Sequence, residues 1–531
     1  MSGQRRITIY DTTLRDGAQA EGVTFSLVDK VAVARRLDEF GVDYIEGGYP
    51  LSNPKDAAFF AEIQKQHLRH ATVVAFGNTR RANVRPEDDA GLRALLEAQT
   101  QAIALVGKSW DLHVRDVLRV SGEENLAMIR DSVAYLKAHG RKVFFDAEHF
   151  FDGYRANPDY ALATVLTAQE AGADAIALCD TNGGMLTEDL RAIVRAVRPR
   201  LGVELGVHTH NDSGLAVANA LAAVQEGADH VQGTINGIGE RSGNADLCVL
   251  IPNLALKMGC EVLVPGAVQQ LTNVSRFIYQ VANLNFSQWQ PYVGPTAFAH
   301  KGGLHVDAVQ KNVLTYEHID PAAVGNERRI LISELSGTSA IMARARKLDE
   351  RIDRQTSRRI LKVVQDLEAQ GYEFEAAEAS FELLVRKLLG THRQFFTLEG
   401  FRVIVEKRGT DEVPISEATV KLTVRGRTRL TVSEGDGPVH ALDGALRAAL
   451  EEFYPQLEKV RLVDYKVRIV NPRAATAART CVVIESTDGN QVWGTVGVSD
   501  NIIEASWQAL IDSIEYKLIQ DDEPGIENPA T

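Results

Sequence analysis

The first 240 residues repeat one pattern eight times, and this repetition limits the possible folds more than any other feature of the chain. Each unit begins with a short run rich in apolar and β-branched residues and continues into a segment with helical periodicity. The eight runs are ITIYD, VDYIEGG, ATVVAFGN, AIALVG, KVFFDAE, AIALCDTNGG, VELGVHTHND and HVQGTINGIGE. Eight strand–helix units in about 250 residues predict an α/β fold, a closed (β/α)8 TIM barrel, rather than an open doubly wound sheet.

The remainder of the chain shows a different sequence pattern. Helical patterns extend from about 245 to 285 and recur over 334–388. Between them, the stretch at 288–321 is interrupted by Gly and Pro residues. From about 395, three strand-like runs precede a helix, and the same arrangement then recurs. SEGDGPVHALDGALRAAL in the first copy resembles GVSDNIIEASWQALIDSI in the second. This duplication predicts a separate α+β domain made of two βββα units.

These patterns divide the 531 residues into four parts, because one hydrophobic core does not serve a chain of this length. We predict a catalytic barrel over 1–285 and helical linker subdomains that contribute to the active site over 286–394. The C-terminal α+β domain covers 395–520. The last part, 521–531, is expected to be a disordered tail.

Composition excludes several classes of function. The chain has 58 basic and 71 acidic side chains, and the net charge of −13 argues against a protein that binds nucleic acid or anionic membranes. No apolar run is long enough to span a bilayer, and no signal-peptide pattern opens the sequence. The four cysteines form no CxxC pair, so we expect a reducing, cytoplasmic location.

Polar residues follow each predicted strand, and in a barrel all these positions meet at the C-terminal face. His208 and His210 stand two apart at the end of the seventh run, so both point to the same side. Neutral imidazole commonly binds divalent ions. Asp16 after the first run supplies a carboxylate, and Asn244 after the eighth supplies a weaker oxygen donor. We predict that these four residues form a metal site; the alternative is a pair of structural histidines.

Other polar residues at the strand ends are candidates for substrate binding and catalysis. Arg15 would hold a carboxylate or a developing enolate oxygen, or it would pair with Glu46, and the two roles are compatible. Glu46 and Glu148 end the second and fifth runs, where each carboxylate is expected to be functional or, alternatively, to anchor Arg15. Thr181, after the sixth, would donate a hydrogen bond to a substrate carboxylate or serve as a turn or N-cap residue.

Further candidates for the active site lie outside the strand ends or line the expected substrate pocket. His305 and Tyr316, in the stretch that follows the barrel, are candidates to reach into the site from outside, although each taken alone fits a structural role better. Candidate walls of the substrate pocket follow the third and fourth runs: Phe76, Asn78, Ser109 and Trp110.

Three motifs together, DTTLRDGAQ, HTHND and GIGERSGN, resemble those of the DRE-TIM metallolyases. This family of metal-dependent (β/α)8 enzymes includes 2-isopropylmalate, homocitrate and citramalate synthases, and the resemblance covers essentially the whole chain. EGGYPLSNPKDAAFF and the stretch at 299–326 are most like the citramalate branch. The resemblance implies a Claisen-type condensation of acetyl-CoA with pyruvate, which gives (R)-citramalate and CoA on the way to isoleucine. The alternative acceptor is 2-oxoisovalerate, which leads to leucine.

The resemblance also assigns roles to the metal-site residues. Asp16, His208 and His210 would hold the divalent ion, with Asn244 bound directly or through water. Mg²⁺ or Mn²⁺ is expected first, and Zn²⁺ is the alternative. Arg15 would stabilise the negative oxygen that forms when the ketone is attacked.

The family further implies roles for the remaining candidates. Thr181 would hold the substrate carboxylate, and Glu148 would border the 2-oxo acid pocket. His305, assisted by Tyr316 and by a glutamate such as Glu46, resembles the group that the family uses for proton transfer.

The C-terminal repeat resembles the allosteric domain of 2-isopropylmalate and citramalate synthases. This resemblance implies a homodimer that isoleucine inhibits, or leucine if the product were 2-isopropylmalate; the alternative is a dimerisation domain without a ligand. Three other functions compete. A 3-hydroxy-3-methylglutaryl-CoA lyase lacks this long domain, and a biotin-dependent carboxyltransferase needs a lysine that FFDAEHF lacks. A non-catalytic sensor would be expected to have lost Asp16 or His208.

Overall fold

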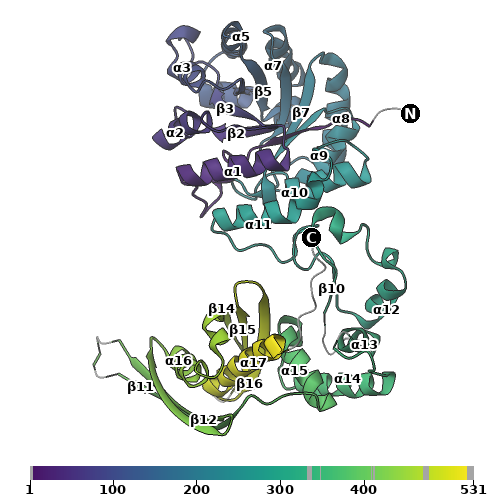
Figure 1. Ribbon diagram of the computed structural model, residues 1–531. Coiled ribbons are helices and arrows are strands. Elements are labelled where there is room, and N and C mark those ends of the chain that lie inside the picture. Colours follow the sequence, from purple (N-terminus) through teal and green to yellow (C-terminus); the bar gives the residue numbers. More distant parts are fainter. Residues whose placement is uncertain are drawn as a thin grey trace. The chain divides into compact units, whose positions relative to one another are not determined.

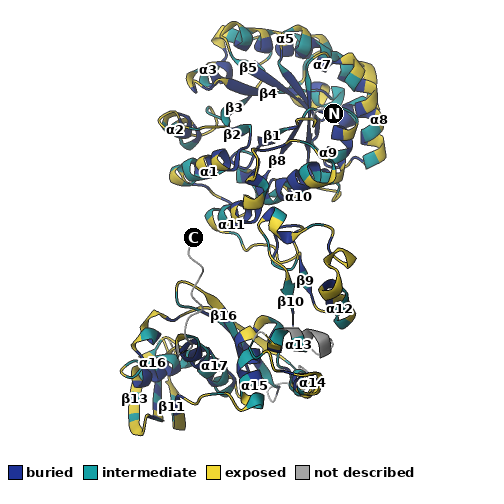
Figure 2. Cartoon of the chain, turned by 45° about the vertical axis from the view of Figure 1, so that its right-hand side comes forward, coloured by how far each residue is buried: buried dark blue, intermediate teal, exposed yellow. Residues whose placement is uncertain are grey.

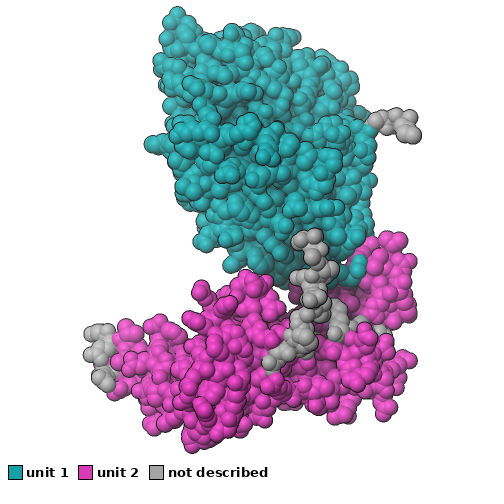
Figure 3. Space-filling view, in the orientation of Figure 1, with its two compact units in different colours: residues 1–298, 318–328 teal, residues 299–317, 329–531 magenta. Residues whose placement is uncertain are grey.

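The computed structural model describes residues 4–331, 338–346, 348–407, 409–410, 413–470 and 478–522. The chain forms two compact units, one of residues 1–298 and 318–328 and the other of residues 299–317 and 329–531 (Figure 3). Each unit has its own hydrophobic core.

Eight parallel strands close into a barrel in the first unit (Figure 1). Each strand pairs with the next, and β8 pairs back to β1, so the predicted barrel is confirmed and the open sheet is excluded. The strands are β1 Thr8–Asp11, β2 Tyr44–Gly48, β3 Thr72–Asn78, β4 Ala102–Lys108, β5 Lys142–Glu148, β6 Ala175–Asp180, β7 Glu204–Thr209 and β8 His230–Gly233.

Helices connect these strands and cover the outside of the barrel. Local sequence sets their ends: Ser26 and Asp29 form a capping box at the start of α1, and Gly41, with a φ of 89°, ends it. The helices are α1 Leu27–Phe40, α2 Pro54–Ile63, α3 Ala90–Glu97, α4 Asp111–His113, α5 Gly122–Ala138, α6 Phe150–Ala156, α7 Pro158–Glu170, α8 Thr187–Val197, α9 Ala216–Gln225, α10 Leu247–Pro252 and α11 Leu271–Val281.

Strand residues alternate between the helices and the lumen. Figure 2 shows the strands buried and the outer helix faces exposed. Outward-facing residues such as Ile103 and Phe145 join the core beneath the helices. A small interior cluster, which includes Tyr10, Val74 and Phe144, fills the lumen near the N-terminal ends of the strands. Asp146 lies two residues after Phe144 on the same strand and faces the lumen as well. Polar groups therefore lie between the apolar cluster and the C-terminal end of the barrel.

The second unit begins with a short parallel pair and four helices. Its elements are β9 Ala299–His300, β10 Arg329–Ile330, α12 Gly303–Lys311, α13 Thr338–Arg346, α14 Arg354–Glu368 and α15 Glu378–Leu389. Two antiparallel three-stranded sheets follow, each with one helix, which confirms the predicted duplication. They comprise β11 Phe396–Glu406, β12 Ile415–Val424, β13 Arg427–Gly435 and α16 Pro438–Leu450, then β14 Arg461–Ile469, β15 Thr480–Thr487, β16 Val492–Ser499 and α17 Ile502–Asp522.

The predicted four-part division remains a prediction, with one correction at its end. Helix α17 extends to Asp522, so residues 521 and 522 are helical rather than part of a tail, because they continue the α17 backbone hydrogen bonding. The rest of the predicted tail, 523–531, lies outside the described residues. Among the described helices, none combines the length and the apolar character needed to cross a membrane.

Candidate active site

Asp16, His208 and His210 come together at the C-terminal end of the barrel. One ligand atom of each lies within 4.8 Å of the other two, and all three side chains are buried. His208 Nε2 is 3.3 Å from His210 Nε2 and 3.3 Å from Asp16 Oδ2. Two ring nitrogens that face each other in this way both direct a lone pair at one point unless one of them is protonated. A cation at that point satisfies both, so the residues present fit a divalent ion.

Asn244 lies against the same point. An isolated bridge pairs its backbone with that of His210, and its Nδ2 is 3.2 Å from both Asp16 Oδ2 and His208 Nε2. Its Oδ1 is buried and has no hydrogen-bond partner among the described residues. Rotation of the amide by 180° exchanges these two atoms and directs an oxygen ligand at the cluster. Two imidazoles, a carboxylate and an amide oxygen suit Mg²⁺, Mn²⁺ or Zn²⁺.

The electrostatic surroundings keep Asp16 and His210 in the protonation states that bind a metal. Burial would raise the pKa of Asp16, but the charge of Arg15, together with the two histidines, outweighs it and lowers that pKa. Burial, with a contribution from His208, lowers the pKa of His210 to about 3. The ring of His210 is therefore neutral at physiological pH, which is the form that binds a metal.

Arg15 is fixed beside the cluster by two carboxylates. Its Nε donates to Glu46 Oε2 at 2.5 Å, and its Nη1 contacts Asp16. The hydroxyl of Tyr10 donates to the other oxygen of Glu46 at 2.9 Å. Burial raises the pKa of Glu46 to about 7, against the opposing effect of Arg15. The Arg15–Glu46 ion pair considered from the sequence is therefore present, and it orients the guanidinium at the barrel mouth.

Glu148 pairs with Lys108 rather than with Arg15. Strands β4 and β5 place the two residues side by side in register, and the ammonium contacts the carboxylate. Lys108 is not among the site residues predicted from the sequence. The signal that was available was its position as the last residue of a barrel strand, where a lysine side chain reaches the mouth.

Thr181 begins the loop after β6. Its Oγ1 accepts a hydrogen bond from the backbone N–H of His149 at 2.9 Å. Because the hydroxyl oxygen is the acceptor there, its own proton can be donated elsewhere. The predicted role as a carboxylate donor and the alternative role as a loop residue are thus compatible.

His305 and Tyr316 lie together in the second unit. Their rings stack with centroids 4.1 Å apart and planes at 29°. Helix α12 carries His305 in its first turn, and Tyr316 follows a short 3₁₀ turn. The contact of these residues with the barrel site stays a prediction.

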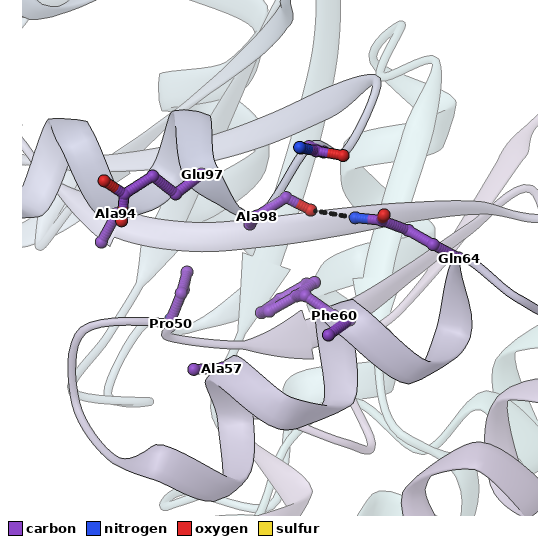
Figure 4. A pocket seen from close by; sticks show the side chains of 9 residues that line it. Pro50, Ala57, Phe60, Gln64, Ala94, Glu97 and Ala98 are labelled. Carbon is purple, nitrogen blue, oxygen red and sulfur yellow. Dashed lines mark hydrogen bonds between the residues drawn. The ribbon is translucent and has the colours of Figure 1, made fainter.

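A hollow on the outside of the barrel, between α2 and α3, holds none of the predicted site residues (Figure 4). Gln64 closes one end of it by donating to the carbonyl of Ala98 at 2.8 Å. Its lining is mainly small and apolar: Pro50, Ala57, Phe60, Ala61, Gln64, Ala94, Glu97, Ala98 and Gln99. The cluster of Asp16, His208 and His210 is at the barrel mouth instead.

Comparison with known proteins identifies similar sequences over nearly the whole chain. The HMGL-like model matches residues 6–278, the homocitrate synthase post-HMGL domain-like model 292–372, and the LeuA allosteric (dimerisation) domain model 375–518. The (R)-citramalate synthase of Geobacter sulfurreducens is 54% identical over 97% of this chain and 98% of its own, and that of Aquifex aeolicus is 51% identical over 98% and 99%. A probable 2-isopropylmalate synthase of Methanopyrus kandleri is 32% identical over 96% and 98%.

Proposed function

This chain belongs to the HMGL-like family and, within it, to the (R)-citramalate synthases, and from this premise we propose how its barrel performs the condensation. The enzyme is of the acyltransferase type. The methyl carbon of acetyl-CoA attacks the ketone of pyruvate, and water then cleaves the thioester to release (R)-citramalate and CoA. Pyruvate is the acceptor, because 2-isopropylmalate synthases are much less similar to this chain.

The observation that carries the proposal is the convergence of Asp16, His208 and His210 beside Arg15. These three residues, with Asn244, would hold a divalent ion. When bound, such an ion polarises the ketone of a 2-oxo acid and orients it for attack. Mn²⁺ or Mg²⁺ is the proposed ion.

Arg15 and Thr181 bind the acceptor. The guanidinium, held by Glu46, stabilises the oxygen that becomes negative as the carbon–carbon bond forms. The hydroxyl of Thr181 donates to the carboxylate, since its oxygen already accepts from a backbone N–H. Glu148, paired with Lys108, borders the pocket.

Proton transfer needs a base for the methyl group of acetyl-CoA. His305 takes this role, with Tyr316 stacked on its ring as an orienting group. Glu46, whose pKa of about 7 lets it hold or release a proton near neutrality, assists on the barrel side.

The second unit regulates the enzyme. The match of residues 375–518 to the LeuA allosteric (dimerisation) domain supports a homodimer with allosteric regulation. Isoleucine is the proposed inhibitor, as suits the first enzyme of a cytoplasmic route to that amino acid. If isoleucine changed neither the rate nor the thermal midpoint, a dimerisation role alone would remain.

A free-thiol assay for CoA release tests the proposal. Protein freed of metal by EDTA and reloaded with Mn²⁺ is given acetyl-CoA with pyruvate, 2-oxoisovalerate, 2-oxoglutarate or no acceptor. Release with pyruvate alone is expected, and it should be lost with EDTA and in His208→Ala. A preference for 2-oxoisovalerate would overturn the choice of acceptor, and absence of release with every acceptor would overturn the condensation.

A further inference from the structure

One hydrogen-bond chain crosses the lumen from β5 through β8 to β7 and ends on a metal-site residue. Gln232 Nε2 donates to Asp146 Oδ1 at 3.0 Å, and Gln232 Oε1 lies 2.9 Å from His208 Nδ1. All three side chains are buried, with exposed fractions of 3% for Asp146, 1% for Gln232 and 5% for His208. Water therefore does not compete for these bonds.

The direction of each bond in this chain follows from what each group can donate. An ionised Asp146 has no proton to give, so it is the NH2 group of Gln232 that faces it, as in the contact at 3.0 Å. The amide is then forced to turn its oxygen toward His208. An oxygen can only accept, so His208 must carry its proton on Nδ1, and its Nε2 keeps a lone pair.

We propose that Asp146 and Gln232 are positioning residues that select the metal-binding tautomer of His208. The inference rests on the metal site of the proposed function and adds two residues to it. His208 Nε2 is the atom that faces Asp16 and His210, at 3.3 Å in each case. The pair thus directs the lone pair at the cluster before an ion arrives, so part of the ordering is complete in the metal-free protein.

His210 provides an internal contrast. Its Nδ1 is buried and has no hydrogen-bond partner among the described residues. The tautomer of His210 is therefore not set in this way, and the control exerted by Asp146 and Gln232 is specific to His208.

The experiment measures Mn²⁺ binding to metal-free protein by titration calorimetry, which does not depend on activity. The variants are Gln232→Leu, Asp146→Asn and the double exchange Asp146→Asn with Gln232→Glu. In the double variant, the carboxylate introduced at position 232 accepts from His208 and from the amide introduced at position 146. The bond from His208 keeps its direction, the bond between positions 146 and 232 is reversed, and the net charge is unchanged. A matched control is Gln290→Leu, because Gln290 is also buried and bridges an aspartate, Asp246 at 2.8 Å, to a second side chain, Tyr279, away from His208.

Gln232→Leu should weaken Mn²⁺ binding by about 10- to 100-fold, the range typical of lost outer partners of a metal-binding histidine. Asp146→Asn should weaken it less, because an asparagine can face Gln232 with either end of its amide. The double exchange should return the affinity to that of the wild type, and Gln290→Leu should leave it unchanged. Thermal unfolding of each metal-free variant identifies any that fail to fold. If a single variant fails to fold, the Mn²⁺ affinity of the double exchange still tests the inference.

Unchanged affinity in Gln232→Leu would overturn the inference, as would a double exchange that binds no better than Asp146→Asn. The metal site itself is tested separately: if wild-type protein bound no Mn²⁺, or if His208→Ala bound it equally well, the proposed function would fail rather than the role of the pair.

Discussion

The guanidinium carbon of Arg15 lies 4.0 Å from the ring centroid of Phe76. Strand β3 directs Phe76 into the lumen, where its ring packs on the interior apolar cluster. Arg15 is thus held by an aromatic face on one side and by the carboxylate of Glu46 through its Nε. A guanidinium fixed in this way needs little reordering when a negative oxygen forms beside it.

Replacement of Phe76 by leucine should reduce kcat/KM for pyruvate by about 2- to 30-fold, because the contact of the cation with the ring contributes about 0.5–2 kcal/mol. Phe76→Tyr keeps the ring face and should stay near the wild type. The measurement is the thiol assay over a range of pyruvate concentrations. If Phe76→Leu matched Phe76→Tyr, the ring would not be what orients Arg15.

Thr181→Val should reduce kcat/KM for pyruvate by about 10- to 100-fold, since a hydrogen bond to a charged group contributes about 1.5–3 kcal/mol. Valine keeps the shape of threonine and removes the hydroxyl. Thr181→Ser retains the donor and is the control. The proposed carboxylate contact would be wrong if serine and valine had the same effect.

Loss of the ammonium in Lys108→Met should lower kcat/KM by up to about fivefold, because a partly exposed ion pair contributes about 1 kcal/mol at most. The side chains of Lys108 and Glu148 are 24% and 23% exposed, so salt should weaken the pair in the wild type. Lys108→Arg preserves the charge and serves as the control. Mn²⁺ affinity should be equal in all three proteins, and a change in it would show that Lys108 acts on the metal site.

Acid should destabilise the second unit through Asp488. Burial acts to raise the pKa of this carboxylate, but hydrogen bonds from Lys517, Gln491 and Asn490 outweigh it and lower the pKa from 3.8 to about 2. The unfolded chain therefore binds the proton more readily between these values. The stabilisation from this group is complete above pH 3.8 and is lost as the pH falls through about 2.

The substitution that removes this charge is Asp488→Asn. It should lower the free energy of unfolding at neutral pH by about 1–2 kcal/mol. Urea unfolding at pH 7 and at pH 3 measures the effect, and the difference between the two proteins should shrink at the lower pH. A difference that did not depend on pH would mean that the charge of Asp488 contributes nothing.

The order of the strands and the convergence of Asp16, His208 and His210 were readable from the sequence because both depend on local features. Runs with period 2 and helices with period 3.6 repeat eight times, and the ends of parallel strands must meet at one face of a barrel. HTHND and Asp16 lie at or just after such ends, so their convergence needed no knowledge of side-chain contacts.

Three features were decided by the tertiary structure alone: the pairing of Lys108 with Glu148, the ring of Phe76 against Arg15, and the chain from Asp146 through Gln232 to His208. Asp146 and Gln232 are 86 positions apart and come from strands that are not neighbours in the barrel. Sequence spacing shows which side chains face the lumen, but it does not show which of them meet across it. Closure of the barrel decides that, because it sets the tilt and register that bring opposite strands within hydrogen-bonding distance.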